Sequence, residues 1–199
     1  MTREHLTALL LAAGESTRMG RSKAMLTWHG KYLIEYQISS MIESGVKEIV
    51  VVLGHEASSI INSVEFDGPT KIVTNEYYKC GKSSSVIAGL QNITQSTSDI
   101  LILAVDQPRS PGLLTELIEA HQTSASKITL PIFQNKGGHP IIFSSALLPL
   151  MMNIDESTQG LRYIVRNNAE FVHRWETQNS EVLLDLNTIS GYATAKGVS

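Results

Sequence analysis

The chain has 199 residues, a mass of 21.8 kDa and a net charge of −3 with histidine neutral, and 42% of its residues are hydrophobic. So high an apolar fraction with so little net charge excludes a disordered chain, and the mild acidity provides no basic face for nucleic acid. This length is typical of one domain, which we expect to span residues 1–199.

The same composition bears on cellular location. The single cysteine, Cys80, cannot form a disulfide within the chain, which favours the reducing cytoplasm. The apolar run from Leu6 to Ala13 is shorter than the roughly 20 residues that cross a bilayer, and the residues from Gly14 onward do not look like a cleavage region. We therefore expect a cytoplasmic protein without a membrane partner.

Apolar runs alternate with amphipathic stretches in the first half of the chain. Thr7–Ala12 predicts a strand buried on both faces, because it is continuously apolar. Leu33–Ser44 predicts a helix, since its apolar residues share one face and Gly45 suits a left-handed cap. The next predicted elements are a strand at Glu48–Leu53, a helix at Ala57–Val64, a strand at Lys71–Thr74 and a helix at Ser84–Ile93.

The second half continues the alternation. Asp99–Val105 predicts a buried strand, and Ser110 and Pro111 then start a helix that runs to about His121. The later predicted elements are strands at Ile128–Phe133 and Pro140–Phe143, a helix at Leu161–Asn168, and strands at Phe171–Trp175 and Val182–Leu186. Strands separated by helices favour an α/β fold with a mainly parallel sheet, whose ligands bind beyond the carboxyl ends of the strands.

The most informative segment is residues 9–26, LLLAAGESTRMGRSKAML, in which a buried strand leads into a glycine-containing loop. Gly14 and Gly20 permit backbone angles that direct several amides at one anion. Arg18 offers a planar fork of donors and Lys23 a point charge, so the loop suits a polyphosphate. Neither the dinucleotide pattern G-x-G-x-x-G nor the P-loop pattern is present. The alternative is a tight turn with solvated charges.

This loop resembles the nucleotidyltransferase pattern L-x-(A/G)-G-x-S/G-x-R-M-G-x-x-K. The matching residues are Leu11, Ala13, Gly14, Ser16, Arg18, Met19, Gly20 and Lys23. The chain is most similar to the molybdenum cofactor cytidylyltransferases within the MobA-like nucleotidyltransferase group. The resemblance implies a Rossmann-like, three-layer nucleotidyltransferase fold with a mainly parallel, mixed sheet.

The resemblance also implies a nucleotide site in which the loop wraps a triphosphate, with Arg18, Lys23 and Asp106 as catalytic residues. Members that use CTP usually carry Ala-Gly at the positions of Ala13 and Gly14, whereas members that use GTP usually carry Gly-Gly. The methyl group of Ala13 would fill space that a purine needs. The implied nucleotide-binding residues are Leu11, Ala12, Ala13, Gly14, Glu15, Ser16, Arg18, Lys23, Gly81, Ser83, Ser84 and Asp106.

Two aspartates, Asp106 and Asp185, each end a predicted strand. Two such carboxylates could share one Mg²⁺ with phosphate oxygens, and the alternative is that each is a turn residue. Asp106 resembles the aspartate of the motif D-x-P, usually D-M-P, with Gln107 in the middle. Asp185 resembles the first aspartate of D-I-D-T-P-E-D, where Asn187 replaces the second and keeps an oxygen without a charge. We expect Asp106 and Asp185 to be the metal ligands.

Residues 75–85, NEYYKCGKSSS, form a second candidate loop. Gly81, Ser83, Ser84 and Ser85 resemble a G-x-x-S-S-L loop that contacts base and ribose in this group, with Val86 where Leu is usual. The alternative is a helix whose first turn is capped by serine, and both interpretations can hold together.

Residues 136–140, KGGHP, form a third candidate loop. They resemble a G-x-x-G-H-P segment of the cytidylyltransferase-like members, which implies that Gly138, His139 and Pro140 bind the acceptor. The alternative is a hairpin turn before a strand.

These observations predict a Mg²⁺-dependent nucleotidyltransferase that transfers CMP from CTP to a phosphorylated acceptor and releases pyrophosphate. By resemblance, the acceptor is molybdopterin loaded with molybdenum, and a molybdoenzyme client is a further expected partner. The same chemistry with GTP or a sugar phosphate remains open. So does a nucleotide-binding protein without catalysis that delivers cofactor to a molybdoenzyme, because Asn187, Ile189 and Ser190 depart from the family motif.

Overall fold

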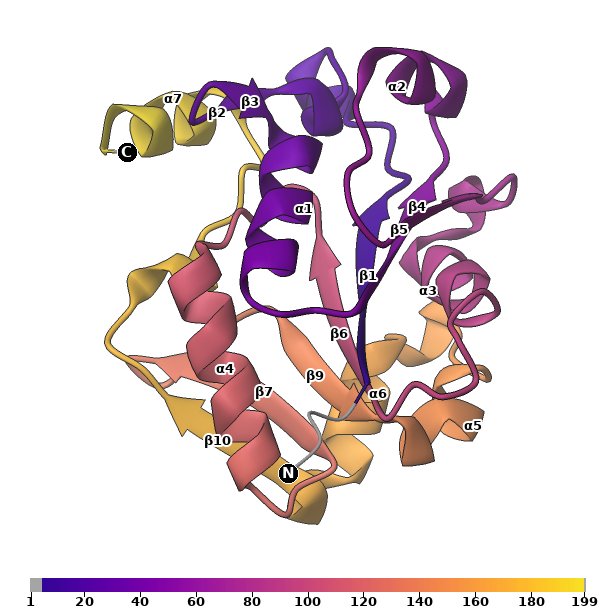
Figure 1. Ribbon diagram of the computed structural model, residues 1–199, viewed down its shortest axis with the longest axis vertical. Coiled ribbons are helices and arrows are strands. Elements are labelled where there is room, and N and C mark those ends of the chain that lie inside the picture. Colours follow the sequence, from indigo (N-terminus) through magenta and orange to yellow (C-terminus); the bar gives the residue numbers. More distant parts are fainter. Residues whose placement is uncertain (1–4, 199) are drawn as a thin grey trace.

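The computed structural model describes residues 5–198 as a twisted sheet covered by helices on both faces (Figure 1). The strands are β1 (Leu6–Ala12), β2 (Thr27–Trp28), β3 (Lys31–Tyr32), β4 (Glu48–Leu53), β5 (Thr70–Thr74), β6 (Asp99–Ala104), β7 (Ile128–Phe133), β8 (Lys136–Gly137), β9 (Ile141–Ser144) and β10 (Val172–Glu176). The α-helices are α1 (Leu33–Glu43), α2 (Ala57–Ser63), α3 (Lys82–Leu90), α4 (Pro111–Thr123), α5 (Leu148–Met151), α6 (Leu161–Asn167) and α7 (Ile189–Val198).

The main sheet has the strand order β10-β7-β9-β6-β1-β4-β5, with β8 paired to β7. β1 lies between β4 and β6 and is parallel to both, whereas β9 is antiparallel to its neighbours β6 and β7. The sheet is therefore mixed and mainly parallel, as expected. β2 and β3 form a separate small hairpin, which the sequence analysis missed.

Alternate residues of each central strand enter two different apolar cores. Leu10 of β1 packs in the core that includes residues of α1, α2 and α4, whereas Leu9 packs in the core that includes residues of α3, α5 and α6. Both leucines are fully buried. A strand buried on both faces has no need of polar alternation, which explains its continuous apolar sequence. The result is the expected three-layer arrangement.

One predicted strand is wrong. Residues 180–183 form a 3-10 helix and residues 184–187 have no regular structure, so Val182–Leu186 is not a strand and Asp185 does not end one. Val182 and Leu186 are fully buried, which accounts for the apolar pattern. The carbonyls of Val182 and Leu184 accept hydrogen bonds from the guanidinium of Arg109 instead of from a neighbouring strand.

The topology brings the informative loops to one edge of the sheet. The parallel strands β1, β4, β5 and β6 end at this edge, and the segment after β8 begins there because β9 runs the opposite way. Residues 13–26, 75–81, 105–109 and 138–140 therefore lie near one another. In residues 5–198, none of the helices is both long enough and apolar enough to span a membrane.

Candidate functional site

A cavity of about 380 Å³ lies beyond the carboxyl end of β1. Its walls combine the glycine loop with the loop before α3 and with Asp106 after β6. The lining residues are Leu11, Ala12, Ala13, Gly14, Ser16, Ser22, Lys23, Ala24, Tyr78, Gly81, Lys82, Ser85, Ala104, Val105 and Asp106. Most of the predicted nucleotide-binding residues therefore border one space.

The glycine loop is held by its own hydrogen bonds and by one buried anchor. Ser16 has a left-handed backbone, and its hydroxyl oxygen accepts from the backbone amide of Lys23 at 3.1 Å. Met19 is 5% exposed and fixes the middle of the loop in the core. A Cβ at Gly14 would meet nothing within 4 Å, so this glycine leaves open space above the loop. The side chain of Arg18 lies outside the part of the chain that the structure describes.

Lys23 connects the loop to the two acidic segments. Its ammonium donates to Asp106 Oδ2 at 2.7 Å and to Asn187 Oδ1 at 2.8 Å. The lysine and Asp106 side chains are 13% and 20% exposed, so the ion pair is partly shielded from water. Asn187, a secondary candidate in the sequence, therefore lies at the centre of the site.

Asp185 reaches the same place by a different contact. The side-chain amide of Gln107 donates to Asp185 Oδ1 at 2.7 Å, and the backbone amide of Leu186 donates to Asp106 O at 2.8 Å. The segment that contains Asp185 thus runs beside the turn that contains Asp106, although Asp185 does not end a strand. The structure brings Lys23, Asp106 and Asp185 into one region.

These two carboxylates fit a divalent cation that is held together with a substrate. The described hydrogen bonds engage one oxygen of Asp106 and one of Asp185, so the second oxygen of each carboxylate is available to bind a cation. Among residues 5–198, no group of three or more His, Cys, Asp and Glu could hold a metal ion. Mg²⁺ is commonly bound by one or two carboxylates plus phosphate oxygens, so this small donor set matches that mode.

The loop before α3 is engaged in its own structure. The Ser83 backbone amide donates to the carboxylate of Glu156, and the Ser84 hydroxyl donates to carbonyls of the loop. Gly81 has a φ of +103° and packs against Glu156, so only glycine fits there without strain. Gly81 borders the smaller cavity, whereas Ser83 borders a larger one.

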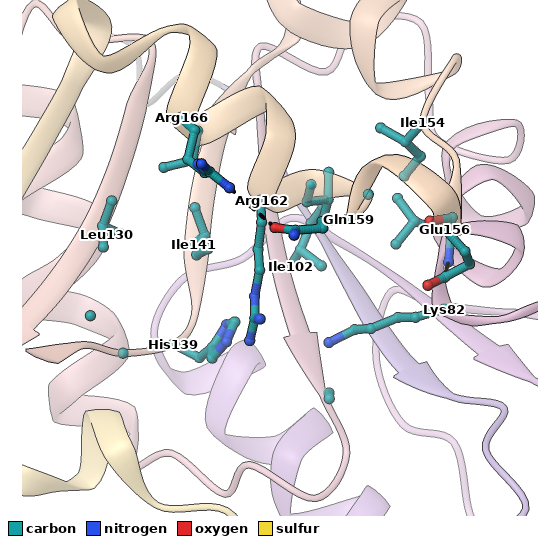
Figure 2. Close-up of a pocket in the computed structure, with 18 residues that line it drawn as sticks. Lys82, Ile102, Leu130, His139, Ile141, Ile154, Glu156, Gln159, Arg162 and Arg166 are labelled. Atoms are coloured by element: carbon teal, nitrogen blue, oxygen red, sulfur yellow. Dashed lines mark hydrogen bonds between the residues drawn. The ribbon is translucent and has the colours of Figure 1, made fainter.

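This larger cavity has a volume of about 680 Å³ and shares Lys82 and Ala104 with the smaller one. Its floor is apolar and includes Ile102 and Ile141. Figure 2 shows Arg162 from α6 extending beside His139, while Lys82 points toward the same space from α3. A largely apolar cavity that is also lined by basic groups suits a ligand that carries an anionic group on a larger body.

The electrostatics of this cavity favour an anion. Among the described interactions, none pairs the Arg162 guanidinium or the Lys82 ammonium with a carboxylate. Partial desolvation in the concave surface lowers the pKa of Lys82, and nearby Arg162 lowers it further, while Asp106 and Asp185 oppose the shift. Lys82 is solvent-accessible, and an incoming anion would stabilise its charged form.

His139 lies in the segment that was expected to bind the acceptor. β7 and β8 form a hairpin whose turn is at residues 134–135, so residues 136–140 are not that turn but β8 and the segment after it, and His139 and Gly138 line the larger cavity. Burial lowers the pKa of His139 to about 4, and the positive charges of Lys82 and Arg109 act in the same direction. The imidazole is therefore neutral near pH 7. Pro140 is buried and is not among the lining residues.

Arg109 is a residue that the sequence analysis missed. It is 1% exposed, and its guanidinium donates to the carbonyls of Pro108, His139, Val182 and Leu184. Burial lowers its pKa to about 10, an effect that Asp185 opposes. Arg109 thus joins the Asp106 turn, the His139 segment and the chain before Asp185. The sequence signal that could have identified Arg109 is its position directly after the D-Q-P motif.

Lys82 and Arg162 were also missed. Lys82 stands between two residues that were selected, and Arg162 shares a helix face with Arg166 at a spacing of four residues. Lys82 occupies a variable position of the G-x-x-S-S-L pattern, and Arg162 belongs to no motif that a single sequence makes visible. Only the approach of α3 and α6 across the cavity reveals that they face one ligand space.

Comparisons with known proteins agree with this geometry. Residues 8–173 match the family model for the MobA-like NTP transferase domain. The nicotine blue oxidoreductase of Paenarthrobacter nicotinovorans is 28% identical over 192 residues, which cover 92% of this chain and 93% of that protein. The bifunctional protein GlmU of Anaeromyxobacter dehalogenans strain 2CP-C is 31% identical over 124 residues, which cover 60% of this chain and 25% of that protein.

Solved structures share the fold. Rv0371c from Mycobacterium tuberculosis H37Rv has a TM-score of 0.86 and 22% identity, covering 98% of this chain and 100% of that one. A nucleotidyl transferase from Methanothermobacter thermautotroptrophicus has a TM-score of 0.81 and 21% identity, covering 97% and 96%. A complex of Rv0371c with manganese has a TM-score of 0.80 and 21% identity, covering 98% and 100%. These structures show the fold that the chain shares, and the family model supports a nucleotidyltransferase.

The close approach of Gly138 to residue 182 generates a first prediction. A Cβ at Gly138 would lie 2.4 Å from Val182 O, whereas a Cβ at Gly137 would lie 3.2 Å from the flexible end of Leu130. We expect Gly138→Ala to lower the free energy of unfolding by about 1–3 kcal/mol in urea titrations, because backbone must move. Gly137→Ala is the matched control, and equal losses in the two variants would contradict this account.

The environment of His139 predicts a pH effect on stability. Its folded-state pKa of about 4 lies below the ordinary 6.5, so the unfolded chain takes up the proton first as the pH falls. The contribution of the neutral imidazole is present above about pH 6.5 and is lost as the pH falls through about 4. We expect His139→Gln to lose less unfolding free energy than the wild type between pH 7 and pH 4 in chemical denaturation. Parallel pH curves would refute the assignment.

Proposed function

Because this chain belongs to the MobA-like NTP transferase family, we propose that it transfers CMP from CTP to a phosphorylated acceptor and releases pyrophosphate. The observation that supports this most directly is the meeting of Lys23, Asp106 and Asn187 beside the glycine-loop cavity. A second cavity of suitable chemistry adjoins the first along Lys82 and Ala104. A donor nucleotide and an acceptor could therefore be bound side by side.

The smaller cavity is the proposed CTP site. The glycine loop would surround the triphosphate, with the ammonium of Lys23 and the guanidinium of Arg18 offsetting its charge. Ala13 is 5% exposed and borders the cavity, and its carbonyl accepts from the backbone amide of His55 at 3.1 Å. The Ala13 methyl group is thus held in place, which supports the preference for a pyrimidine over a purine.

Asp106 and Asp185 are the proposed ligands of Mg²⁺, with phosphate oxygens completing its coordination. When bound, the cation would offset negative charge that accumulates on the α-phosphate and the departing pyrophosphate. Asn187 has no charge to contribute, and its side-chain oxygen already accepts from Lys23. Its proposed role is to hold the Lys23 ammonium against Asp106.

The larger cavity is the proposed acceptor site. Arg162 and Lys82 would bind the acceptor phosphate, and the apolar floor would hold the rest of the molecule. A cavity of about 680 Å³ accommodates a ligand the size of a pterin derivative, which is consistent with molybdopterin loaded with molybdenum. That specific acceptor rests on the family resemblance.

The chemistry requires positioning more than acid–base catalysis. An oxygen of the acceptor phosphate attacks the α-phosphorus of CTP, the new P–O bond forms and the bond to pyrophosphate breaks. Because the acceptor phosphate is anionic near neutral pH, no general base has to remove a proton. His139 is neutral there and would serve as a hydrogen-bonding group in the acceptor cavity. Fixed cations and geometry would supply most of the rate acceleration.

A second candidate function is an oxidation–reduction reaction. One observation favours it, since nicotine blue oxidoreductase aligns with nearly the whole of this chain. Consumption of reduced nicotinamide nucleotide in the presence of nicotine blue, without pyrophosphate release from any NTP, would support it. The Lys23–Asp106–Asn187 arrangement favours nucleotidyl transfer.

The proposed metal site predicts the effect of neutralising Asp106. With CTP, Mg²⁺ and molybdenum-loaded molybdopterin, we expect Asp106→Asn to lower kcat/KM for pyrophosphate release at least about 100-fold, because one of two carboxylate ligands is lost. The exposed Asp67→Asn variant is the control. GTP should support little turnover. CTP binding without pyrophosphate release from the wild type would instead identify a nucleotide-binding protein without catalysis.

The proposed acceptor site predicts that a substitution there changes the KM for the acceptor but not the KM for CTP. Replacing Arg162 by Met removes a charge-assisted contact to the acceptor phosphate, so the acceptor KM should rise about 10- to 100-fold. The KM for CTP should stay within about twofold, measured in the same pyrophosphate assay. Arg174→Met, on the exposed face of β10, is the matched control. A rise in the CTP KM with an unchanged acceptor KM would reject the assignment.

A further inference from the structure

We propose that Gln107 is a positioning residue that fixes the carboxylate of Asp185 for a divalent cation. This inference rests on the proposed function, because it assumes that Asp185 binds the metal. The observation that carries it is the partly buried hydrogen bond of 2.7 Å from the Gln107 side-chain amide to Asp185 Oδ1. Gln107 would act through Asp185 and would not itself touch the cation.

Asp185 needs such support because its own segment has no regular secondary structure. Residues 184–187 belong to no helix and no strand, and Asp185 is exposed. The neighbouring backbone is tied down by the turn after β6: Arg109 donates to Leu184 O at 3.0 Å, and the Leu186 amide donates to Asp106 O at 2.8 Å. These contacts place the backbone of Asp185, but they do not orient its side chain.

Gln107 can orient that side chain because its own position is fixed on both sides. It is 6% exposed, its Oε1 accepts from the Ala104 amide at 3.4 Å, and its backbone carbonyl accepts from Gln37 Nε2 at 2.6 Å. Reversing the side-chain amide would place its oxygen against the carboxylate and its NH₂ group against the Ala104 amide. Both contacts would be repulsive, so the donor must face Asp185.

A neutral amide has a particular advantage at this position. Asp106 is paired with the cationic Lys23, which offsets its charge, whereas Gln107 engages one oxygen of Asp185 without offsetting its charge. The second oxygen of Asp185 is left for a cation. A methionine, which usually occupies the middle position of the resembling D-x-P motif, could not donate this hydrogen bond. Gln107 thus supports the remaining aspartate where Asn187 replaces the other.

The test measures metal-dependent nucleotide binding without turnover. Mn²⁺ is the probe, a non-hydrolysable α,β-methylene CTP analogue is the nucleotide, and the readout is the ratio of analogue Kd in EDTA to analogue Kd in Mn²⁺. Electron paramagnetic resonance of Mn²⁺ reports the metal directly. We expect Gln107→Met to reduce the ratio about 10-fold with the Kd in EDTA unchanged, because loss of an outer partner typically weakens metal binding by this order. Gln122→Met, exposed on α4, is the matched control.

A double-mutant cycle separates positioning from general support of the fold. If Gln107 acts through Asp185, adding Gln107→Met to Asp185→Asn produces no further loss of the ratio. A loss that also occurs in EDTA, or that is additive in the double variant, overturns the inference. If Asp185→Asn abolishes the Mn²⁺ effect and Gln107→Met retains it, only the role of Gln107 fails. If the wild type shows no Mn²⁺ effect, both the role of Gln107 and the proposed metal site are wrong.

Discussion

The ammonium of Lys23 is the interaction on which the arrangement of the site depends. It joins Asp106, which is 83 residues away in the chain, and Asn187, which is 164 residues away. Both contacts are shorter than 3 Å and partly shielded from water, so the ion pair with Asp106 is less screened than one on the open surface. Without this cation, the glycine loop would lose its direct side-chain contacts with the turn after β6 and with the segment before α7.

Arg109 performs the corresponding task from inside the protein. Its guanidinium is buried without a carboxylate partner in the described part of the chain, and its hydrogen bonds go to four backbone carbonyls. The desolvation of such a charge is costly, and these carbonyl dipoles together with the field of Asp185 offset it. Arg109 thus helps to hold the chain around Asp185, together with the hydrogen bonds of Leu186 to Asp106 and of Gln107 to Asp185, in place of a sheet partner.

The two cavities meet along Lys82, and this shared wall connects the donor and acceptor halves of the proposed reaction. The positive charges of Lys82 and Arg162 border the larger cavity, whereas Lys23 and its acidic partner Asp106 border the smaller one. A phosphate bound between Lys82 and Arg162 would thus face the α-phosphate of a nucleotide in the glycine loop. This spatial order would suit the proposed reaction, since positioning is the main requirement of phosphoryl transfer.

The sequence by itself determined the central strands, the main helices and the mainly parallel α/β architecture, because residues such as Leu9 and Leu10 reveal burial on both faces through their local pattern. It also located the glycine loop and Asp106. It could not distinguish a strand from the segment that Val182–Leu186 forms, because apolar residues at this spacing can be buried in either conformation. Tertiary structure alone decided the conformation of that segment, the contact of Gln107 with Asp185 across 78 residues, and the approach of Lys82 to Arg162. Local periodicity records which face of an element is buried, whereas partners between distant loops depend on how the whole sheet brings its ends together.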